Sequence, residues 1–247
     1  MRKKAKGSVL TDIGMRRDYN EDAVCTVPQA HFYAVADGIG QMAFGGKTAA
    51  IACRQMAVSA EEIYRDYTVH GSEQKAAEEL KAALAEISSR IFQKGNDPEV
   101  YRYGCTFCGA MVFEKQIAVV NVGDSRAYIK RKDRDELHQI TEDHNLAAMA
   151  VKNGYMTYEE AVSRGMASRL LNFIGISEET EVDLFLHDRL KAEAVLLCTD
   201  GLSSMVSDKD MAVCIRNHRT PERVCRNLIR MANRKGGKDN ISVAVVK

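Results

Sequence analysis

Two apolar, strand-like runs in this chain each end in an aspartate that is followed by glycine. The first run ends at Asp37 and the second at Asp200. Asp124 follows another apolar run, and Asp239 stands just before the last one. A carboxylate at the open end of a buried strand is held rigidly, and several such ends in one place provide the oxygen ligands that hard divalent cations prefer. The pattern therefore predicts a metal-dependent enzyme that acts on phosphate.

Hydrophobic periodicity predicts many short strands interrupted by helices. Strands are expected at 7–13, 23–27, 31–36, 103–113, 116–122, 126–130, 181–186, 194–198 and at the end of the chain. Helical spacing covers 47–67, 72–94 and 221–234, and a helical region covers 142–175. Ser72, Thr157 and Thr220 are candidate N-caps, and Pro221 follows Thr220 at the first helical position. A strict strand–helix–strand alternation is missing, so the pattern indicates an α+β fold with antiparallel sheets packed face to face and helices outside.

Composition excludes several classes of protein. The chain has 247 residues, of which 45% are hydrophobic, and this is sufficient for one domain with a sizeable core. The net charge of +1 comes from 35 basic and 34 acidic residues, so no basic stripe predicts nucleic-acid binding. The basic start, 1–7, has no apolar segment after it, and no run approaches the roughly 20 apolar residues of a membrane span. We expect a soluble, cytoplasmic protein without nucleic-acid or membrane partners.

Seven cysteines are scattered along the chain, which is not the pattern of a disulfide framework. Cys105 and Cys108 form a lone C-x-x-C within the predicted strand 103–113. Residues three apart on a strand face opposite sides, so the two sulfurs should diverge. Two small buried residues are therefore favoured over a zinc or redox site.

Five separated motifs, taken together, are similar to one family. They are the charged segment 14–22, Asp37-Gly38, Gly123-Asp124-Ser125-Arg126-Ala127, Thr199-Asp200-Gly201 and Asp239-Asn240. In this order, from about Gly7 to Val246, they resemble the metal-dependent protein phosphatases (PPM, type 2C) in their compact bacterial form. The resemblance implies a single domain over 1–247, built as a four-layer α-β-β-α sandwich. It also implies that 142–175 is a helical flap near the metal edge, whereas an ordinary helical insertion is the alternative.

The resemblance also implies a binuclear Mn²⁺ or Mg²⁺ centre that activates a water, with a third, more weakly held ion. Its metal ligands would be Asp37 as the bridge, the Gly38 carbonyl, Asp200 and Asp239 on one ion, Asp22 and (through water) Glu21 at the other, and Asp124 for the third ion. Arg17 corresponds to the phosphate-binding arginine of the family, and we expect its neighbour Arg16 to be solvated. Carboxylates suit Mg²⁺ and Mn²⁺, and an arginine can hold two phosphate oxygens at once.

The activity implied is hydrolysis of phosphoserine and phosphothreonine in proteins by direct attack of the metal-activated water, without a covalent phospho-enzyme. Such an enzyme would oppose a Ser/Thr protein kinase, which is itself a plausible substrate. We expect a monomer, because no apolar stripe is left over once the core helices are assigned. Two other functions are weighed: a catalytically weakened member that binds phosphoproteins or a partner, and a phosphatase of small molecules or nucleic acid.

The chain departs from the family pattern in the loop after Asp37. Gln41-Met42 stands where relatives carry Gly-His, and Gly45-Gly46 stands where they carry Gly-Glu. Ile39 stands where eukaryotic relatives have a histidine general acid. None of these changes removes a metal ligand, but they alter the support of the site. His144 could be a general acid, but a lone histidine after an aspartate is more often a neighbour of a helix N-cap or a surface residue. The other five histidines are expected to be structural.

Overall fold

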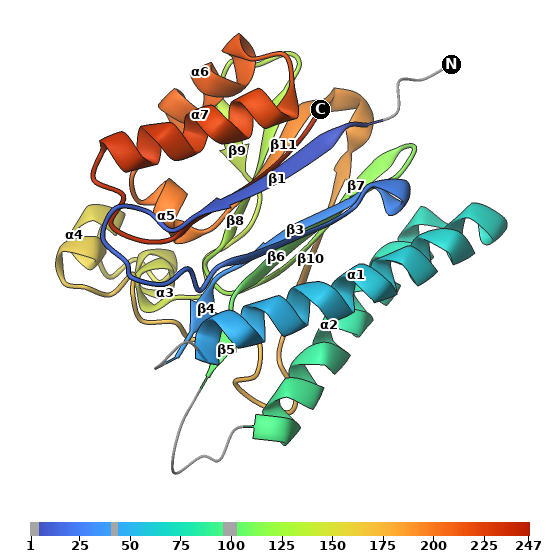
Figure 1. The fold of residues 1–247 in the computed structure, drawn as a ribbon, viewed down its shortest axis with the longest axis horizontal. Helices are drawn as coiled ribbons and strands as arrows, with labels where there is room; N and C mark the ends of the chain where they lie inside the picture. The colour runs from blue at the N-terminus through green and yellow to red at the C-terminus, as the bar shows by residue number, and fades with distance from the viewer. Residues whose placement is uncertain (1–4, 41–43, 96–102) are drawn as a thin grey trace.

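The computed structural model describes residues 5–40, 44–95 and 103–247. Its centre is a pair of five-stranded antiparallel sheets that face each other (Figure 1). The strand order in the first sheet is β1 (Gly7–Asp12), β12 (Ile241–Val246), β11 (Ala192–Cys198), β8 (Arg126–Arg131) and β9 (Leu137–Gln139). The order in the second is β10 (Asp183–Asp188), β7 (Gln116–Val122), β6 (Phe107–Val112), β3 (Phe32–Ala36) and β2 (Ala23–Val27). A small third sheet pairs β4 (Gly38–Ile39) with β5 (Gly104–Cys105).

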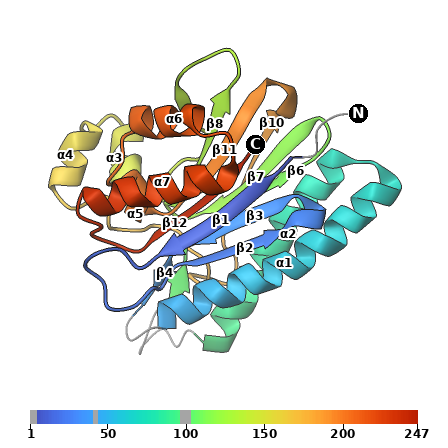
Figure 2. The same ribbon diagram turned by 45° about the horizontal axis from the view of Figure 1, so that its top comes forward.

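Helices cover both outer faces of the sheet pair. The long ones are α1 (Phe44–His70), α2 (Glu73–Gly95), α6 (Asp208–Asn217) and α7 (Pro221–Arg234), and the short ones are α3 (Leu146–Lys152), α4 (Tyr158–Ser163) and α5 (Asp200–Ser203). Two 3₁₀ turns, η1 (Pro28–Ala30) and η2 (Arg189–Lys191), lie in connections. Figure 2 shows α1 and α2 on one side of the sheets and α6 and α7 on the other. The predicted four-layer α-β-β-α sandwich is confirmed.

Three apolar cores hold the four layers together. One lies between α1, α2 and the second sheet, one between the two sheets, and one between the first sheet, α6 and α7. Strand β3 shows why a central strand is apolar throughout: Phe32, Ala34 and Ala36 face the helices, whereas Tyr33 and Val35 face the other sheet. A strand buried on both faces needs apolar residues at successive positions. Each large side chain buried in this way stabilises the fold by about 1.5–3 kcal/mol.

The predicted helix starts are confirmed. Ser72 Oγ accepts a hydrogen bond from the Lys75 backbone N–H at 3.2 Å, just before α2. Thr157 and Glu160 form a reciprocal capping box at α4. Thr220 caps α7, with Pro221 in the first turn. These caps satisfy backbone donors that the first helical turn leaves free.

The predicted strand 103–113 is wrong as a single element, because it is interrupted at Thr106. The chain continues past Asp37 as β4, which pairs with β5, so β5 separates from the main sheet and β6 begins only at Phe107. Cys105 lies in the helix-side core and Cys108 between the sheets, so the predicted divergence of the two thiols is confirmed.

Further elements were not predicted: the short strands β4 and β9, the 3₁₀ turns η1 and η2, the single-turn α5, and α6. The sequence does carry a start signal for α6, since Ser207 accepts a hydrogen bond from the Asp210 backbone N–H. None of the helices in the described part of the chain combines the length and the apolar character needed to cross a lipid bilayer.

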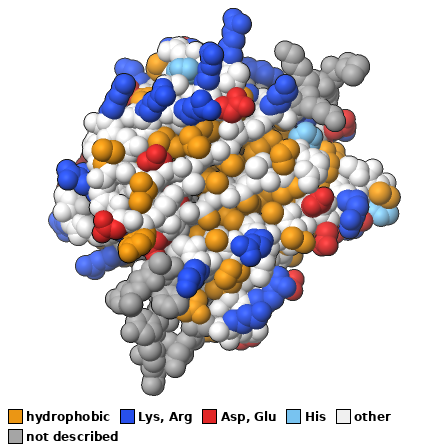
Figure 3. All heavy atoms as spheres, viewed as in Figure 1, with side chains coloured by type: hydrophobic (Ala, Val, Ile, Leu, Met, Phe, Trp, Pro, Cys, Tyr) orange, Lys and Arg blue, Asp and Glu red, His pale blue; other side chains and the backbone are white. Residues whose placement is uncertain are grey.

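Apolar side chains also lie on the surface along one face. Figure 3 shows them on the side of the molecule that carries β1 and α1. The partly exposed ones there include Leu10 on β1, and Ile51 and Val58 on α1. Single exposed apolar residues are normal in monomers, so the expected monomeric state stays a prediction.

Candidate metal centre

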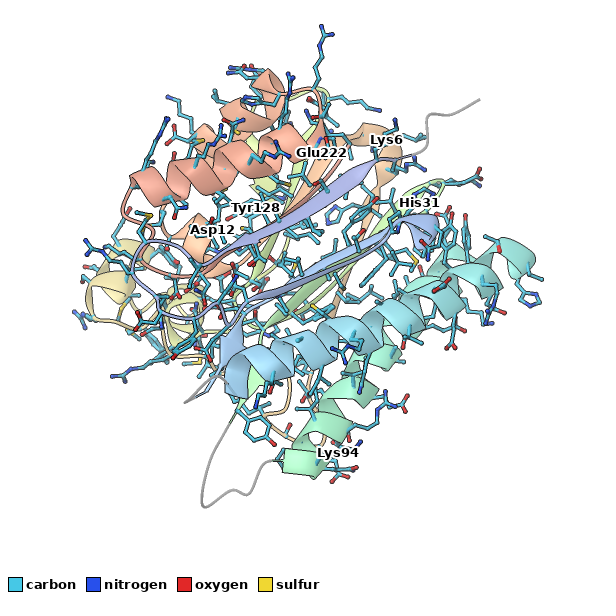
Figure 4. The ribbon with its side chains drawn as sticks, viewed as in Figure 1. Lys6, Asp12, His31, Lys94, Tyr128 and Glu222 are labelled. Carbon is cyan, nitrogen blue, oxygen red and sulfur yellow. The ribbon has the colours of Figure 1, made fainter. Side chains whose placement is uncertain are left out.

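The predicted metal-binding carboxylates come from five different places in the fold and meet at one end of the sandwich. Glu21 and Asp22 stand just before β2. Asp37 follows β3 directly, and Asp124 lies in the turn between β7 and β8. Asp200 begins α5 just after β11, and Asp239 stands before β12. This is the end at which β4 and α5 lie in Figure 1. In Figure 4, Asp12 at the end of β1 lies on this side, and His31 lies toward the opposite end.

Burial and mutual repulsion show that these carboxylates lie close together. Burial raises the pKa of Asp37 well above its ordinary value, and the negative charges of Asp22, Asp200, Asp124 and Asp239 raise it further. Burial likewise raises the pKa of Asp22 to about 7 and that of Asp124 to about 7. Burial also raises the pKa of Asp200, which interacts directly with the side chain of Asp37.

Arg17 is the cation placed against this group of charges. Its Nη2 donates a hydrogen bond to Asp239 Oδ2 at 2.7 Å, and this contact raises the pKa of Arg17. The side chain of Arg17 is 50% exposed, so the guanidinium lies at the mouth of the site and is not enclosed in it. One surface guanidinium does not neutralise five neighbouring carboxylates.

Several oxygens in the group have no hydrogen-bond partner among the residues that the structure describes. Thr199 Oγ1 donates to Asp22 Oδ2 at 2.9 Å, but the second oxygen of Asp22 has no partner. The same holds for Glu21 Oε1 and Asp200 Oδ1, which are also buried. Buried carboxylate oxygens without donors are costly, and a divalent cation would satisfy them. The donor set therefore fits hard cations such as Mn²⁺ and Mg²⁺.

The carboxylates do not yet form a closed cage. Within 5–40, 44–95 and 103–247, no three His, Cys, Asp or Glu side chains converge on a single point in a way that would hold an ion. The candidate ligands are therefore distributed along this edge of the sandwich.

Asn240 holds this edge in place without facing the metal-binding side. Its Oδ1 accepts the Glu21 backbone N–H at 2.8 Å, and its Nδ2 donates to the carbonyls of Ile13 and Tyr19, both at 2.9 Å. Asn240 thereby fixes the predicted charged segment 14–22 beside Asp239. The sequence motif Asp239-Asn240 pointed to this residue but not to its partners.

Thr106 is a supporting residue that sequence reasoning missed. Its Oγ1 accepts the Asp37 backbone N–H at 3.0 Å and shares a 2.6 Å hydrogen bond with Ser125 Oγ. Its own N–H donates to the Asp37 carbonyl at 2.8 Å. Thr106 thus links the Asp37 backbone to Ser125 in the turn that contains Asp124. The only available signal was a polar residue inside an apolar run.

Close packing explains the glycines around Gly38. A Cβ on Gly38 would lie 2.3 Å from the Gly45 carbonyl carbon, and one on Gly46 would lie 3.0 Å from Glu21 Cα. The first turn of α1 therefore packs directly on β4 and on the metal-binding segment. Gly45-Gly46, where the chain departs from the family pattern, therefore has this packing role. The departure at Gln41-Met42 lies in 41–43, outside the described residues.

The helical region 142–175 is tied to the sheet beside Asp124. Arg126 on β8 donates to Asp143 at 2.6 and 2.8 Å, and to the Tyr158 hydroxyl on α4 at 2.9 Å. A groove of about 1110 Å³ runs between this region and the sheet, with Asp143, Tyr158, Leu171 and Asp183 in its walls. The region therefore forms one wall of a groove, whose lining includes His144, a hydrogen-bond partner of the Gly123 backbone next to Asp124.

His144 is not the surface residue that sequence reasoning considered. Its side chain is only 15% exposed, and Nε2 lies 3.0 Å from Asp183 Oδ2. Nδ1 lies 3.2 Å from the Gly123 backbone N–H. Because both ring nitrogens are engaged within the protein, the arrangement does not support the general-acid alternative.

Comparison with known proteins agrees with this arrangement. The sequence profile of the family Protein phosphatase 2C matches residues 15–242. The chain belongs to the protein phosphatase 2C family. The family is one of metal-dependent protein phosphatases, so the chain is a hydrolase that requires divalent metal, and the expected resemblance is confirmed.

Individual protein phosphatase 2C relatives match the chain over nearly its whole length. Protein phosphatase PhpP of Streptococcus pneumoniae is 30% identical, over 97% of this chain and 96% of its own. Serine/threonine phosphatase stp of Listeria innocua is 28% identical, over 96% of this chain and 93% of its own. A crystal structure of the catalytic domain of serine threonine protein phosphatase PstP, in complex with 2 manganese ions, superposes on this chain with a TM-score of 0.81. The two sequences are 28% identical, and the match covers 98% of this chain and 97% of that one.

The raised pKa values predict that the metal-free protein loses stability as the pH rises. Asp22, with a pKa of about 7, keeps its proton in the folded state at pH values where the unfolded chain, with a pKa of 3.8, has released it. The free energy of unfolding therefore falls between about pH 4 and 7, at a rate of up to ~1.4 kcal/mol per pH unit. The raised pKa of Asp124 lowers the free energy of unfolding with rising pH in the same way.

Thermal unfolding checks this prediction. In EDTA, Tm should be lower at pH 8 than at pH 5.5, and the gain in Tm on adding Mn²⁺ should be larger at pH 8. Asp22→Asn should flatten the fall in EDTA, whereas Asp210→Asn at the exposed Lys235 pair should not. A metal-free Tm that rises through this pH window would contradict the account of the carboxylates.

Proposed function

We propose that this protein removes phosphate from phosphoserine and phosphothreonine in other proteins, at the carboxylate edge of the sandwich. The observation that carries the proposal is the set of buried carboxylate oxygens without hydrogen-bond donors beside a half-exposed arginine. Such a site attracts divalent cations and, with them, a phosphate dianion. Membership of the protein phosphatase 2C family supports this activity.

Each predicted residue has a role in this proposal. Asp37 would bridge two ions, with the Gly38 carbonyl, Asp200, Asp239, Asp22 and, through water, Glu21 completing their ligands. Two bound Mn²⁺ or Mg²⁺ ions supply a lowered water pKa and neutralise the phosphoryl charge. Asp124 would hold a third ion. Its position in a turn of its own, between β7 and β8, supports that separate role.

Arg17 would orient the phosphate. A guanidinium has five N–H donors, and the contact with Asp239 uses Nη2. Its remaining donors can hold two phosphoryl oxygens, which fixes the phosphorus for in-line attack. Because Arg17 is already bound to Asp239, its head is placed before the substrate arrives.

The substrate would be a segment of polypeptide that carries the phosphorylated residue. The groove between 142–175 and the sheet gives room for the residues that flank it, and we propose 142–175 as a flap over the site within a single domain, 1–247. A cognate Ser/Thr kinase that carries phosphorylated residues would be one such substrate. The balanced net charge of +1 is unfavourable for nucleic-acid substrates. A monomeric state and a cytoplasmic location remain part of the proposal.

The proposal is tested by comparing substrates in the presence of Mn²⁺. Phosphate release from phosphothreonine and phosphoserine peptides should exceed release from a phosphotyrosine peptide and from a nucleotide by about tenfold or more. Equal rates on all of them would replace the proposal by a general phosphatase. If none is hydrolysed although calorimetry shows that the folded protein binds the phosphopeptide, the non-catalytic binding role would take its place.

A further inference from the structure

His144 connects three segments of the chain that the reaction does not otherwise link. Its Nδ1 accepts the Gly123 backbone N–H at 3.2 Å and lies 3.1 Å from Asn172 Nδ2. Its Nε2 lies 3.0 Å from Asp183 Oδ2, at the start of β10. The ring therefore stands between the Asp124 turn, the far end of the region 142–175, and the second sheet.

The hydrogen bonds fix the tautomer of the ring. A backbone N–H can only donate, so Nδ1 must present its lone pair to Gly123. The proton then lies on Nε2, which donates to Asp183. The two ring nitrogens thus have different partners, and the hydrogen bonds of each can be removed separately by substitution.

The backbone of His144 repeats the connection. Its N–H donates to the Gly123 carbonyl at 3.0 Å, and its carbonyl accepts the Leu171 N–H at 2.8 Å. Gly123 thereby exchanges hydrogen bonds in both directions with one residue. Both ends of 142–175 are joined at this point, because His144 lies near its start and Leu171 near its end.

The turn held by this residue leads directly into the site. Gly123 has a φ of +101°, a conformation that glycine adopts without strain, and Asp124 follows it. The carboxylate of Asp124 accepts a hydrogen bond from Asn145, which is also the N-cap of α3. The peptide before Asp124 and the side chain of Asp124 are thus both held by neighbouring residues at the start of 142–175.

We propose that His144 is a positioning residue that fixes the Gly123–Asp124 turn against both ends of the flap, so that the placement of Asp124 depends on the flap. This inference rests on the proposed function, in which Asp124 holds an ion. Both ring nitrogens of His144 are engaged within the protein, so His144 acts through the Gly123 peptide. The hydrogen bond from the Gly123 N–H fixes the turn, and the hydrogen bond to Asp183 orients the ring.

Two substitutions, each of which can mimic one ring nitrogen, separate the contact with Gly123 from the contact with Asp183. In His144→Asn, the amide oxygen can take the place of Nδ1 and accept the Gly123 N–H, while the contact with Asp183 is lost. In His144→Gln, the longer amide reaches toward Asp183 but leaves the Gly123 N–H without its acceptor. His144→Ala removes both contacts. Val224→Ala, in the buried core of α7, is a control that lowers stability away from the turn.

The first readout is amide hydrogen exchange of the segment 117–126 in the metal-free protein. We expect about tenfold faster exchange at Gly123 in His144→Gln and His144→Ala, and nearly wild-type exchange in His144→Asn and Val224→Ala. Equal protection in His144→Asn and His144→Gln, or unchanged protection in His144→Ala, would overturn the inference. If His144→Ala does not fold, the Asn and Gln variants decide the question.

The second readout is the Mn²⁺ concentration that gives half-maximal phosphatase activity. It should rise about tenfold in His144→Gln and stay near the wild-type value in His144→Asn. Val224→Ala should lower Tm without changing this concentration. If the wild-type protein itself shows no activity, the proposed function fails, and hydrogen exchange still decides the role of His144 on its own.

Discussion

Replacing Asp37 by asparagine is expected to abolish Mn²⁺-dependent phosphatase activity while the protein stays folded. The loss should be about a thousandfold, which corresponds to about 4 kcal/mol in the activation barrier. Asp37 is the carboxylate on which the charges of Asp22, Asp124, Asp200 and Asp239 all act, so it is the central one of the group. An amide in its place keeps the size of the side chain and removes the charge that would join two cations.

Stability separates this result from simple unfolding. Because the neighbouring carboxylates repel Asp37, removal of its charge should leave the Tm in EDTA unchanged or higher. Asp210→Asn is the matched control, since it removes a carboxylate from an exposed pair with Lys235 at 3.0 Å. An exposed pair of this kind contributes little to stability, and activity should be unaffected. An Asp37→Asn protein with full activity would overturn the assignment of the site.

A methyl group at Gly201 should disrupt the same site from the backbone. The Cβ of an alanine there would lie 1.9 Å from the Asn240 carbonyl oxygen, which is impossible without a shift of α5 or of the start of β12. Asp200 precedes Gly201 and Asp239 precedes Asn240, so the shift would separate two of the proposed ligands. We expect Gly201→Ala to lose about 1–3 kcal/mol or more of unfolding free energy and at least tenfold in activity at limiting Mn²⁺.

Gly71→Ala is the control for this substitution. Gly71 has a φ of +76°, and no atom lies within 4 Å of an added Cβ, so the change introduces backbone strain without crowding. It should lower Tm and leave the dependence of activity on Mn²⁺ unchanged. Chemical denaturation and Mn²⁺ titration of both variants provide the comparison. If Gly201→Ala affects stability alone, as Gly71→Ala does, then the close approach of α5 to Asn240 does not set the ligand positions.

The carboxylates of the site could be predicted because each lies next to an apolar run in the sequence. Asp37 and Asp200 follow strands whose period and composition identify them without tertiary information. The cap residues Ser72, Thr157 and Thr220 were equally visible, because an N-cap acts on backbone atoms only a few residues away. Local signals therefore located both the elements and the ends at which the ligands stand.

The contacts that hold the proposed ligands in place could not be predicted, because the partners are distant in the sequence. Thr106 bonds to the Asp37 backbone 69 positions away, and Asn240 bonds to the Glu21 backbone 219 positions away. His144 reaches Asp183 across 39 positions. His144 does stand beside a helix start, at Asn145, but nothing in the surrounding residues shows that both of its ring nitrogens are hydrogen-bonded within the protein. The break at Thr106 has the same cause, since it depends on the chain after Asp37 pairing with β5.

If this edge of the sandwich hydrolyses phosphoprotein only with divalent metal bound to its carboxylates, removal of the metal should abolish phosphate release reversibly. The most direct measurement is phosphate release from a phosphothreonine peptide by one preparation, with Mn²⁺, with EDTA, and with excess Mn²⁺ restored after EDTA. The account predicts activity in the first and third samples and none in the second. Equal activity in EDTA, or no activity in any sample from folded protein that binds Mn²⁺, would contradict it.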